Sequence, residues 1–293
     1  MSFIDKLDLS VKNPIPASSF SMESWKGAAY DNDMKSWWIN EIGGYIAFKL
    51  TLKTQQGINL ILKLQSAVVS GKSDCPITIT VNGVDMVENF DPHIYEFYNR
   101  SWYLTASHLN VGDNEIKVQL LNGTTGVYIQ EATATEYTMA MQQQPAWCWS
   151  TVTACTSRFY DNKSTWTPCQ IVNTALNQTT CCEDGSTTEC DVPWYLDKAL
   201  KITGNLVSFS KGDETIDTVL EQLNDNRPLG IRIAFGTAGH FVVITGVGAN
   251  NEMVAVEDSY FGPSYIKYET LKTKYKGSGV WSHSYFTKPD KGE

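Results

Sequence analysis

Long apolar runs and clusters of basic residues are both missing from this 293-residue chain. No stretch reaches the ~18 apolar residues of a membrane-crossing helix, so the sequence predicts no membrane span. Residues 1–10 lack the basic start and the apolar run of a Sec-type signal peptide. The 23 Lys and Arg are outnumbered by 32 Asp and Glu, and the net charge of −9 is spread over both halves. Nucleic acid is therefore not an expected partner.

Histidine is also scarce, which narrows the search for a catalytic base, since histidine is the side chain that exchanges protons near neutral pH. The chain has four: His93, His108, His240 and His283. His93 and His108 lie in turn-rich surroundings and His283 lies on an alternating run near the end, so structural or exposed roles are the simpler interpretation for these three. His240 follows Gly239 between two strand-like apolar runs, which predicts an imidazole at the start of a buried strand.

The most distinctive stretch is residues 139–160, which read MAMQQQPAWCWSTVTACTSRFY. After Cys148, apolar residues recur every three or four positions, which predicts a helix with one buried face. Cys148 would lie in the first turn of that helix, where free N–H groups and the positive end of the macrodipole favour a thiolate, the form that attacks carbonyl carbon. The alternative is a structural cysteine buried between Trp147 and Trp149.

A carboxylate follows His240 in the chain. Residues 253–259 (MVAVEDS) alternate, so Val254, Val256 and Asp258 would share one face of a strand. Asp258 ends this strand. The pattern therefore predicts an acceptor for a hydrogen bond from the second imidazole nitrogen of His240.

The order Cys, His, Asp, with a glutamine six residues before the cysteine, resembles the papain-like cysteine peptidases. The likeness is to a bacterial branch whose signature runs Gln-Gln, a short spacer, Trp-Cys-Trp, then a later Gly-His and an Asp at a strand end, and it covers roughly the second half of the chain. The resemblance implies that Cys148 is the nucleophile and that His240 is the general base and acid. It also implies that Asp258 orients the imidazole and that Gln142 is the oxyanion donor. Gln143 and Gln144 stay open as alternatives for the donor. No cofactor and no metal are implied.

Residues 1–137 predict an all-β domain. Five short alternating or β-branched runs are separated by Gly, Asn and Asp turns, at residues 45–52, 59–65, 77–83, 115–120 and 127–132. This spacing is typical of a two-sheet sandwich. The pieces GGYIAF, ITITVNG and LNVGDNEI resemble those of galactose-binding-like jelly rolls and carbohydrate-binding modules, which implies a glycan ligand for this domain.

Seven aromatic residues of this first half offer stacking faces for such a glycan. They are Trp25, Trp37, Trp38, Tyr95, Tyr98, Trp102 and Tyr103. The alternative is that most of them fill the sandwich core, as large aromatic residues usually do.

Five of the seven cysteines crowd into residues 155–190: Cys155, Cys169, Cys181, Cys182 and Cys190. Adjacent cysteines do not match the Cys-x-x-Cys pairs of zinc sites, so disulfides and an oxidising destination are expected instead. The pairing stays open, because one cysteine is left over unless Cys75 or a thiol of another chain joins. Disulfides without a signal peptide point to secretion by a signal-less route or to a leader removed earlier, with a cytoplasmic location as the alternative.

We therefore expect a multidomain protein, with a β-sandwich over residues 1–137 and an α+β papain-like domain over residues 138–293. Its expected function is hydrolysis of peptide or isopeptide amide bonds in a protein or peptide substrate, with targeting by a sugar-binding first domain. Two alternatives remain open. One is an acyltransferase that uses the same triad, and the other is a non-catalytic glycan- or surface-binding protein with a relic triad.

Overall fold

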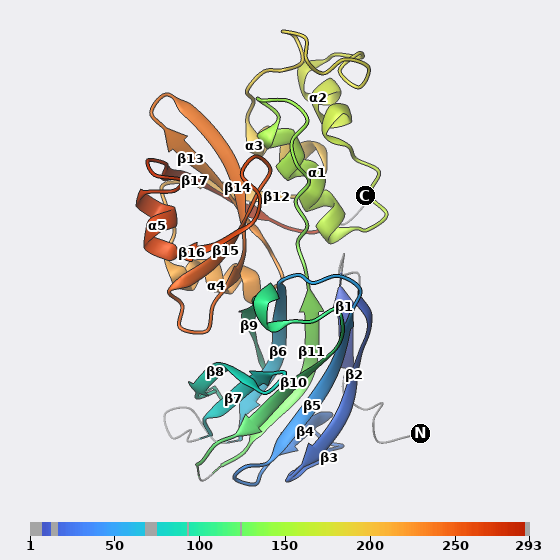
Figure 1. Cartoon of the computed structure of the whole chain (residues 1–293), viewed down its shortest axis with the longest axis vertical. Helices are drawn as coiled ribbons and strands as arrows, with labels where there is room; N and C mark the ends of the chain where they lie inside the picture. Colours follow the sequence, from blue (N-terminus) through green and yellow to red (C-terminus); the bar gives the residue numbers. More distant parts are fainter. Residues whose placement is uncertain (1–7, 13–16, 68–74, 93, 124, 291–293) are drawn as a thin grey trace. The chain divides into compact units, whose positions relative to one another are not determined.

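The computed structural model describes residues 8–12, 17–67, 75–92, 94–123 and 125–290. Alternating apolar residues of the first half form two mostly antiparallel sheets (Figure 1). His93 lies outside the described residues. The chain divides into two compact units, Met1–Thr135 and Glu136–Glu293.

The strands of the first unit are β1 (Asp8–Lys12), β2 (Ala17–Lys26), β3 (Ala28–Asp31), β4 (Ser36–Ile39), β5 (Tyr45–Leu52), β6 (Ile58–Ser66), β7 (Ile77–Val81), β8 (Val84–Phe90), β9 (Tyr98–Leu104), β10 (Gly112–Leu120) and β11 (Val127–Thr135). One sheet has the order β3-β4-β11-β6-β9, with β1 parallel to β11, and the other has the order β2-β5-β10-β7-β8. Their inner faces share one apolar core. The expected β-sandwich is confirmed.

Several aromatic residues considered for glycan stacking lie in this core. Trp37 and Trp102 are each 1% exposed, as the alternative of core packing predicts. Trp25 and Tyr95 are 38% and 49% exposed, and they remain accessible. The indole of Trp25 packs against that of Trp37, with ring centroids 5.0 Å apart.

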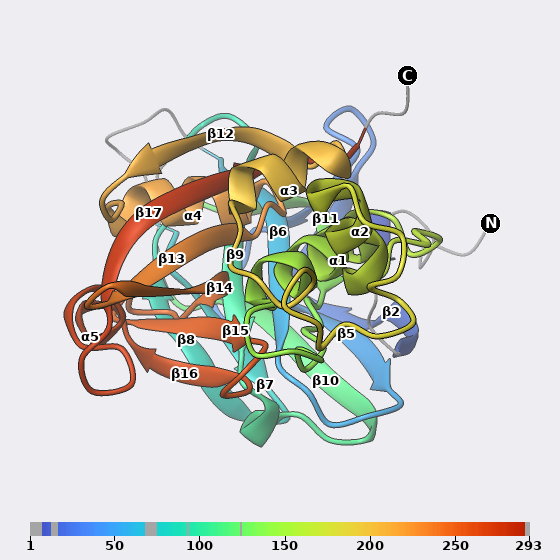
Figure 2. The same cartoon turned by 90° about the horizontal axis from the view of Figure 1, so that it is seen from above.

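The second unit places helices on both faces of one antiparallel sheet (Figure 2). Its elements are α1 (Cys148–Tyr160), α2 (Pro168–Leu176), α3 (Leu196–Ile202), β12 (Leu206–Lys211), α4 (Ile216–Asn224), β13 (Leu229–Phe235), β14 (Ala238–Val247), β15 (Met253–Asp258), β16 (Ser264–Lys267), α5 (Tyr268–Thr273) and β17 (Val280–Thr287). The sheet order is β12-β17-β13-β14-β15-β16. The expected α+β layout is confirmed, and α5 lies between β16 and β17 in the chain.

Two separate cores hold this unit together, one on each face of the sheet. The first joins α1, α2 and α3 to Phe241, Val243 and Tyr285. The second joins α4 and α5 to the opposite side chains of the same strands, which include Val242, Ile244 and Val256. None of the described helices is long and apolar enough to cross a membrane.

Candidate active site

Cys148 is the first residue of α1, as the apolar period predicts. No side chain caps this helix start, and its first turn carries no acidic residue. An uncapped helix start is thus the position that the structure gives to Cys148. Its side chain is buried, as are those of Trp147 and Trp149.

The cysteine-rich loop holds the residues on both sides of Cys148. Ala146 N donates to Asp191 Oδ1 at 2.8 Å, and Trp147 Nε1 donates to the carbonyl of Cys190 at 2.8 Å. Trp149 Nε1 donates to the carbonyl of Val192 at 3.1 Å. These three bonds fix the entry into α1 from one short segment of the loop.

Two disulfides close this loop, as expected: Cys169–Cys182 and Cys181–Cys190. Cys181 therefore pairs with a later cysteine, and the adjacent Cys182 pairs with an earlier one. Cys155 is the cysteine of residues 155–190 that remains a thiol. Cys155 is buried in α1, where its sulfur accepts from Ala140 N at 3.4 Å. Burial raises the pKa of this thiol, which makes it a poor nucleophile.

We predict that loss of the Cys181–Cys190 disulfide lowers hydrolysis more than loss of the Cys169–Cys182 disulfide. Each double Cys→Ala variant should lose about 2–4 kcal/mol of unfolding free energy, because the unfolded chain regains freedom. Only loss of the Cys181–Cys190 disulfide frees the backbone of Cys190, whose carbonyl accepts the hydrogen bond from the Trp147 indole. Thermal unfolding and kcat/KM of the two variants provide the comparison, and equal losses of kcat/KM would contradict the role assigned to Cys190.

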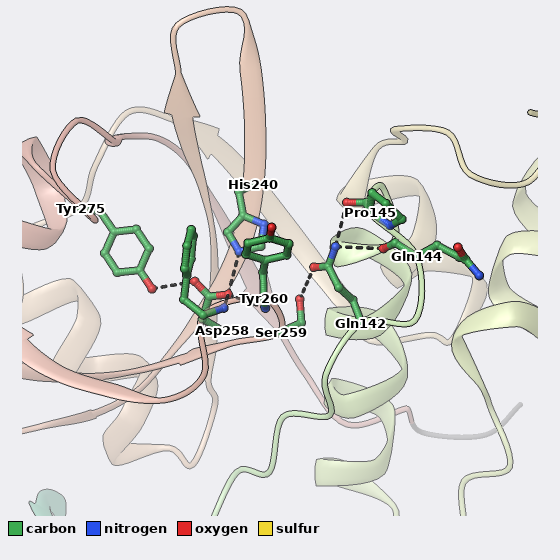
Figure 3. Close-up of polar contacts among 9 residues, drawn as sticks. Gln142, Gln144, Pro145, His240, Asp258, Ser259, Tyr260 and Tyr275 are labelled. Atoms are coloured by element: carbon green, nitrogen blue, oxygen red, sulfur yellow. Dashed lines mark hydrogen bonds and ion pairs between the residues drawn. The ribbon is translucent and has the colours of Figure 1, made fainter. Parts of the chain in front are cut away.

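His240 lies at the start of β14, and its imidazole faces Asp258 (Figure 3). Its Nε2 is 2.8 Å from Asp258 Oδ1. Cys148 is the other side chain that acts on this imidazole and contributes to its raised pKa. Because Asp258 engages Nε2, Nδ1 is the nitrogen left for the thiol. The structure thus brings Cys148, His240 and Asp258 together from α1, β14 and β15.

The imidazole of His240 holds its proton strongly. Burial opposes the charged form, but the hydrogen bonds to Asp258 and Cys148 and the charges of the same groups outweigh it and raise the pKa of His240 to about 9. At neutral pH this side chain is an imidazolium. It can therefore donate a proton to a departing amine.

Asp258 is 1% exposed and accepts four hydrogen bonds. Oδ1 accepts from His240 and from the backbone N–H groups of Tyr260 and Phe261, at 2.7 and 2.9 Å, and Oδ2 accepts from the hydroxyl of Tyr275 at 2.7 Å. Burial opposes ionisation, yet His240 and these donors hold the pKa of Asp258 below its usual range. The carboxylate is thus fixed in position and charge.

Tyr275 was not expected to take part in the site, and it is the residue that holds the far oxygen of Asp258. We predict that Tyr275→Phe lowers kcat several-fold, because one buried carboxylate oxygen loses its donor; stability should fall by about 1–3 kcal/mol. Tyr268→Phe is the matched control, since the Tyr268 hydroxyl donates to the backbone carbonyl of Glu214 at 2.6 Å, away from the site. A loss of kcat that is equal in the two variants would show that Tyr275 acts only through stability.

Gln142 is anchored to the residue that follows Asp258 (Figure 3). Its backbone N–H donates to the carbonyl of Ser259 at 2.8 Å, and its Oε1 accepts from the Ser259 hydroxyl at 2.8 Å. Its Nε2 donates to the carbonyls of Gln144 and Pro145, at 2.9 and 2.8 Å. Both amide hydrogens are therefore engaged, and one of them must be released to bind an oxyanion.

The two alternatives for the donor are placed differently. The side chain of Gln144 points away from His240 (Figure 3), and Gln143 is exposed.

Two of the other histidines lie in structural surroundings. His283 lies on β17, and His108 hydrogen-bonds to Thr105 Oγ1 through Nδ1 at 2.7 Å. No sequence signal pointed to Tyr275, which lies 17 residues after Asp258. Ser259 could have been found, because it directly follows Asp258 in the chain.

Comparison with known proteins gives one match to a family model. The Peptidase C39-like family model matches residues 128–288, which is more than half of the chain and includes Gln142, Cys148, His240 and Asp258. No curated protein matches the chain.

Solved structures resemble each half. The peptidase domain of Streptococcus ComA, a bifunctional ABC transporter involved in quorum sensing, is 16% identical, with 53% of this chain and 99% of that chain covered and a TM-score of 0.38. A family 35 carbohydrate-binding module from Paenibacillus barcinonensis is 14% identical, with 41% and 99% covered and a TM-score of 0.33. A family 36 module in complex with calcium and xylotriose is 15% identical, with 40% and 98% covered and a TM-score of 0.31.

The family assignment rests on the family model and agrees with the expected papain-like resemblance of the second half. The matched residues contain the buried cysteine at a helix start that faces a histidine. This chain belongs to the Peptidase C39-like family and is a cysteine peptidase.

Proposed function

We propose that the second unit hydrolyses peptide or isopeptide amide bonds with Cys148 as nucleophile, His240 as general acid and base, and Asp258 as the residue that orients His240. The observation that carries this proposal is that two groups act on His240: Asp258, whose Oδ1 is 2.8 Å from Nε2, and Cys148, which contributes to the raised pKa of the imidazole. A Cys–His pair oriented by a third group is the arrangement of nucleophilic catalysis.

The chemistry proceeds in two halves. The Cys148 thiolate attacks the carbonyl carbon, a C–S bond forms, and the carbonyl oxygen becomes an oxyanion. The His240 imidazolium gives its proton to the amine as the C–N bond breaks. Water then attacks the acyl-enzyme, His240 takes a proton from the water, and the C–S bond breaks to release the acid. These steps consume one water and need no cofactor.

Gln142 and the backbone N–H of Cys148 are the proposed oxyanion donors. Ser259 holds Oε1 of Gln142, so the opposite end of the amide is turned toward the start of α1. The carbonyls that engage Nε2 are the groups an oxyanion would replace.

We predict that Gln142→Ala lowers kcat by about 10²–10³, the usual loss for one oxyanion donor. Gln143→Ala, in the exposed neighbour, is the matched control and should keep the parent kcat. Steady-state kinetics of Gln142→Ala, Gln143→Ala and Gln144→Ala separate the three positions. A larger loss in Gln144→Ala than in Gln142→Ala would move the donor to Gln144.

Labelling tests the proposed function directly. A thiol-directed epoxide at slightly acidic pH should modify Cys148, the thiol on which His240 acts, and leave Cys75 and Cys155 unmodified, with the site read by mass spectrometry. Digestion of a proteome-derived peptide mixture, with and without an added amine, then separates hydrolysis from acyl transfer. No labelling and no cleavage would favour a relic triad.

For the first unit we propose glycan binding that directs the peptidase to its substrate. The accessible aromatic faces of Trp25 and Tyr95 support this proposal. Co-sedimentation of the full chain with insoluble polysaccharides, compared with Trp25→Ala and Tyr95→Ala, tests it. The two disulfides support an oxidising, extracellular destination for the chain.

A further inference from the structure

Three basic side chains form a row across neighbouring strands of the second unit. Lys211 on β12 is opposite His283 on β17, and His283 is opposite Arg232 on β13. Directly opposed residues of antiparallel strands project from the same face of a sheet. Lys211, His283 and Arg232 are called the basic row below.

The basic row lies on the face of the sheet that α1 covers. Arg232 is opposite Phe241 of β14, and Phe241 packs into the same core as Cys148. The guanidinium of Arg232 lies against Gly239, where an added Cβ would clash with it. Gly239 directly precedes His240 in β14. The side chains of the row share the face of α1 and Cys148, whereas His240 is opposite Ile233, which packs on the other face of the sheet.

The basic row forms no ion pair with the part of the chain that the structure describes. Burial, and then the charges of Arg232 and Lys211, lower the pKa of His283. Burial, and then the charge of Asp197 on α3, raise the pKa of the neighbouring Tyr285, and Asp197 forms no ion pair with Arg232. This is a local surplus of positive charge in a chain of net charge −9.

The row is also open to a ligand. Lys211 is exposed, and Arg232 and His283 are half-buried. Arg232 Nη1 donates to Ser282 Oγ at 3.0 Å, which fixes one side of the guanidinium and leaves other donors of its fork available. A half-buried guanidinium with free donors pairs well with a carboxylate, because it offers two parallel N–H groups.

We propose that the basic row is a substrate subsite that binds the carboxylate of an acidic side chain, so that the enzyme prefers peptides with Glu or Asp close to the cleaved bond. The inference rests on the proposed peptidase activity, because the row gains this meaning only beside a working Cys148 and His240. Arg232 supplies the directional contact, and Lys211 supplies long-range attraction at the exposed end of the row.

Cleavage-site profiling followed by matched peptides tests the inference. The full chain is incubated with a proteome-derived peptide mixture, and cleavage sites are read by mass spectrometry. Synthetic pairs that carry Glu or Gln at the enriched position are then compared by kcat/KM, with amidated C-termini so that the Glu side chain is the carboxylate tested. We expect the Glu peptide to be favoured by about tenfold, the worth of one charge-assisted hydrogen bond.

Variants then locate the preference. Arg232→Gln and Lys211→Gln should each move the Glu-to-Gln ratio of kcat/KM toward one, and Lys211→Gln serves in case Arg232→Gln folds poorly. Lys267→Gln is the matched control, since Lys267 is also an exposed lysine on an edge strand of this sheet and should keep the ratio. Cleavage without enrichment of acidic residues, or an unchanged ratio in both row variants, would overturn the inference. Absence of any cleavage would instead overturn the proposed peptidase activity.

Discussion

Replacement of Cys148 by alanine is expected to lower amide hydrolysis by about 10⁵-fold or more while leaving the fold intact. The side chain is small, alanine is a good helix former, and the hydrogen bonds that fix this helix start come from residues 146, 147 and 149. His240→Ala should cost about as much. The double variant should be little worse than either single variant, because thiol and imidazole act as one unit.

The control for this prediction lies in the same helix. Cys155→Ala removes a buried thiol that contacts Ala140 N but not His240, so hydrolysis should stay near the parent value. Thermal unfolding of all variants shows that the comparison is made between folded proteins. Activity near the parent value in His240→Ala would mean that another base acts, and His283 would be the next residue to test.

Replacement of Asp258 by alanine is expected to lower kcat/KM by about 10²–10³, less than the loss of Cys148 or His240, because Asp258 orients the imidazole and stabilises its charge without bonding to substrate. The cost in stability should be about 3–5 kcal/mol, the usual range when one partner of a buried ion pair is removed. The hydroxyl of Tyr275 and the N–H groups of Tyr260 and Phe261 would also lose their acceptor.

Asp258→Asn separates the hydrogen bond from the charge. The asparagine oxygen can still accept from Nε2 of His240, so we expect most of the hydrolysis to return. The negative charge that helps to raise the pKa of His240 to about 9 is lost, so that pKa should fall. The basic limb of the kcat/KM against pH profile should therefore move below about 9. An Asn variant as inactive as the Ala variant would show that the charge itself is required.

The sequence identified the inner strands of the sandwich better than its edges. The five expected runs correspond to β5, β6, β7, β10 and β11, which all have neighbours on both sides. The strands it missed include β2, β3, β8 and β9, which end the two sheets. Edge strands carry exposed polar residues, as in β8, where Val87 is the one buried position, so their apolar pattern is weak.

The pairing of the cysteines could not be predicted from the sequence either. Spacing alone favoured disulfides over zinc, and the structure contains two of them. Which cysteine stays free depended on packing, since Cys155 is directed into the core of α1 and its neighbours, away from the loop. The role of Tyr275 was equally hidden, because its hydroxyl reaches the carboxylate of Asp258 only once the turn after α5 lies against the end of β15.

The sequence by itself determined the chemistry of this protein: a cysteine at a helix start, a histidine at a strand start and an aspartate at a strand end, each readable because local periodicity fixes where an element begins and which face a side chain takes. The tertiary structure alone decided which groups meet. The bond of Gln142 to Ser259, the bonds of His240 and Tyr275 to Asp258, and the basic row all join residues far apart in the chain, and such contacts follow from sheet order and register.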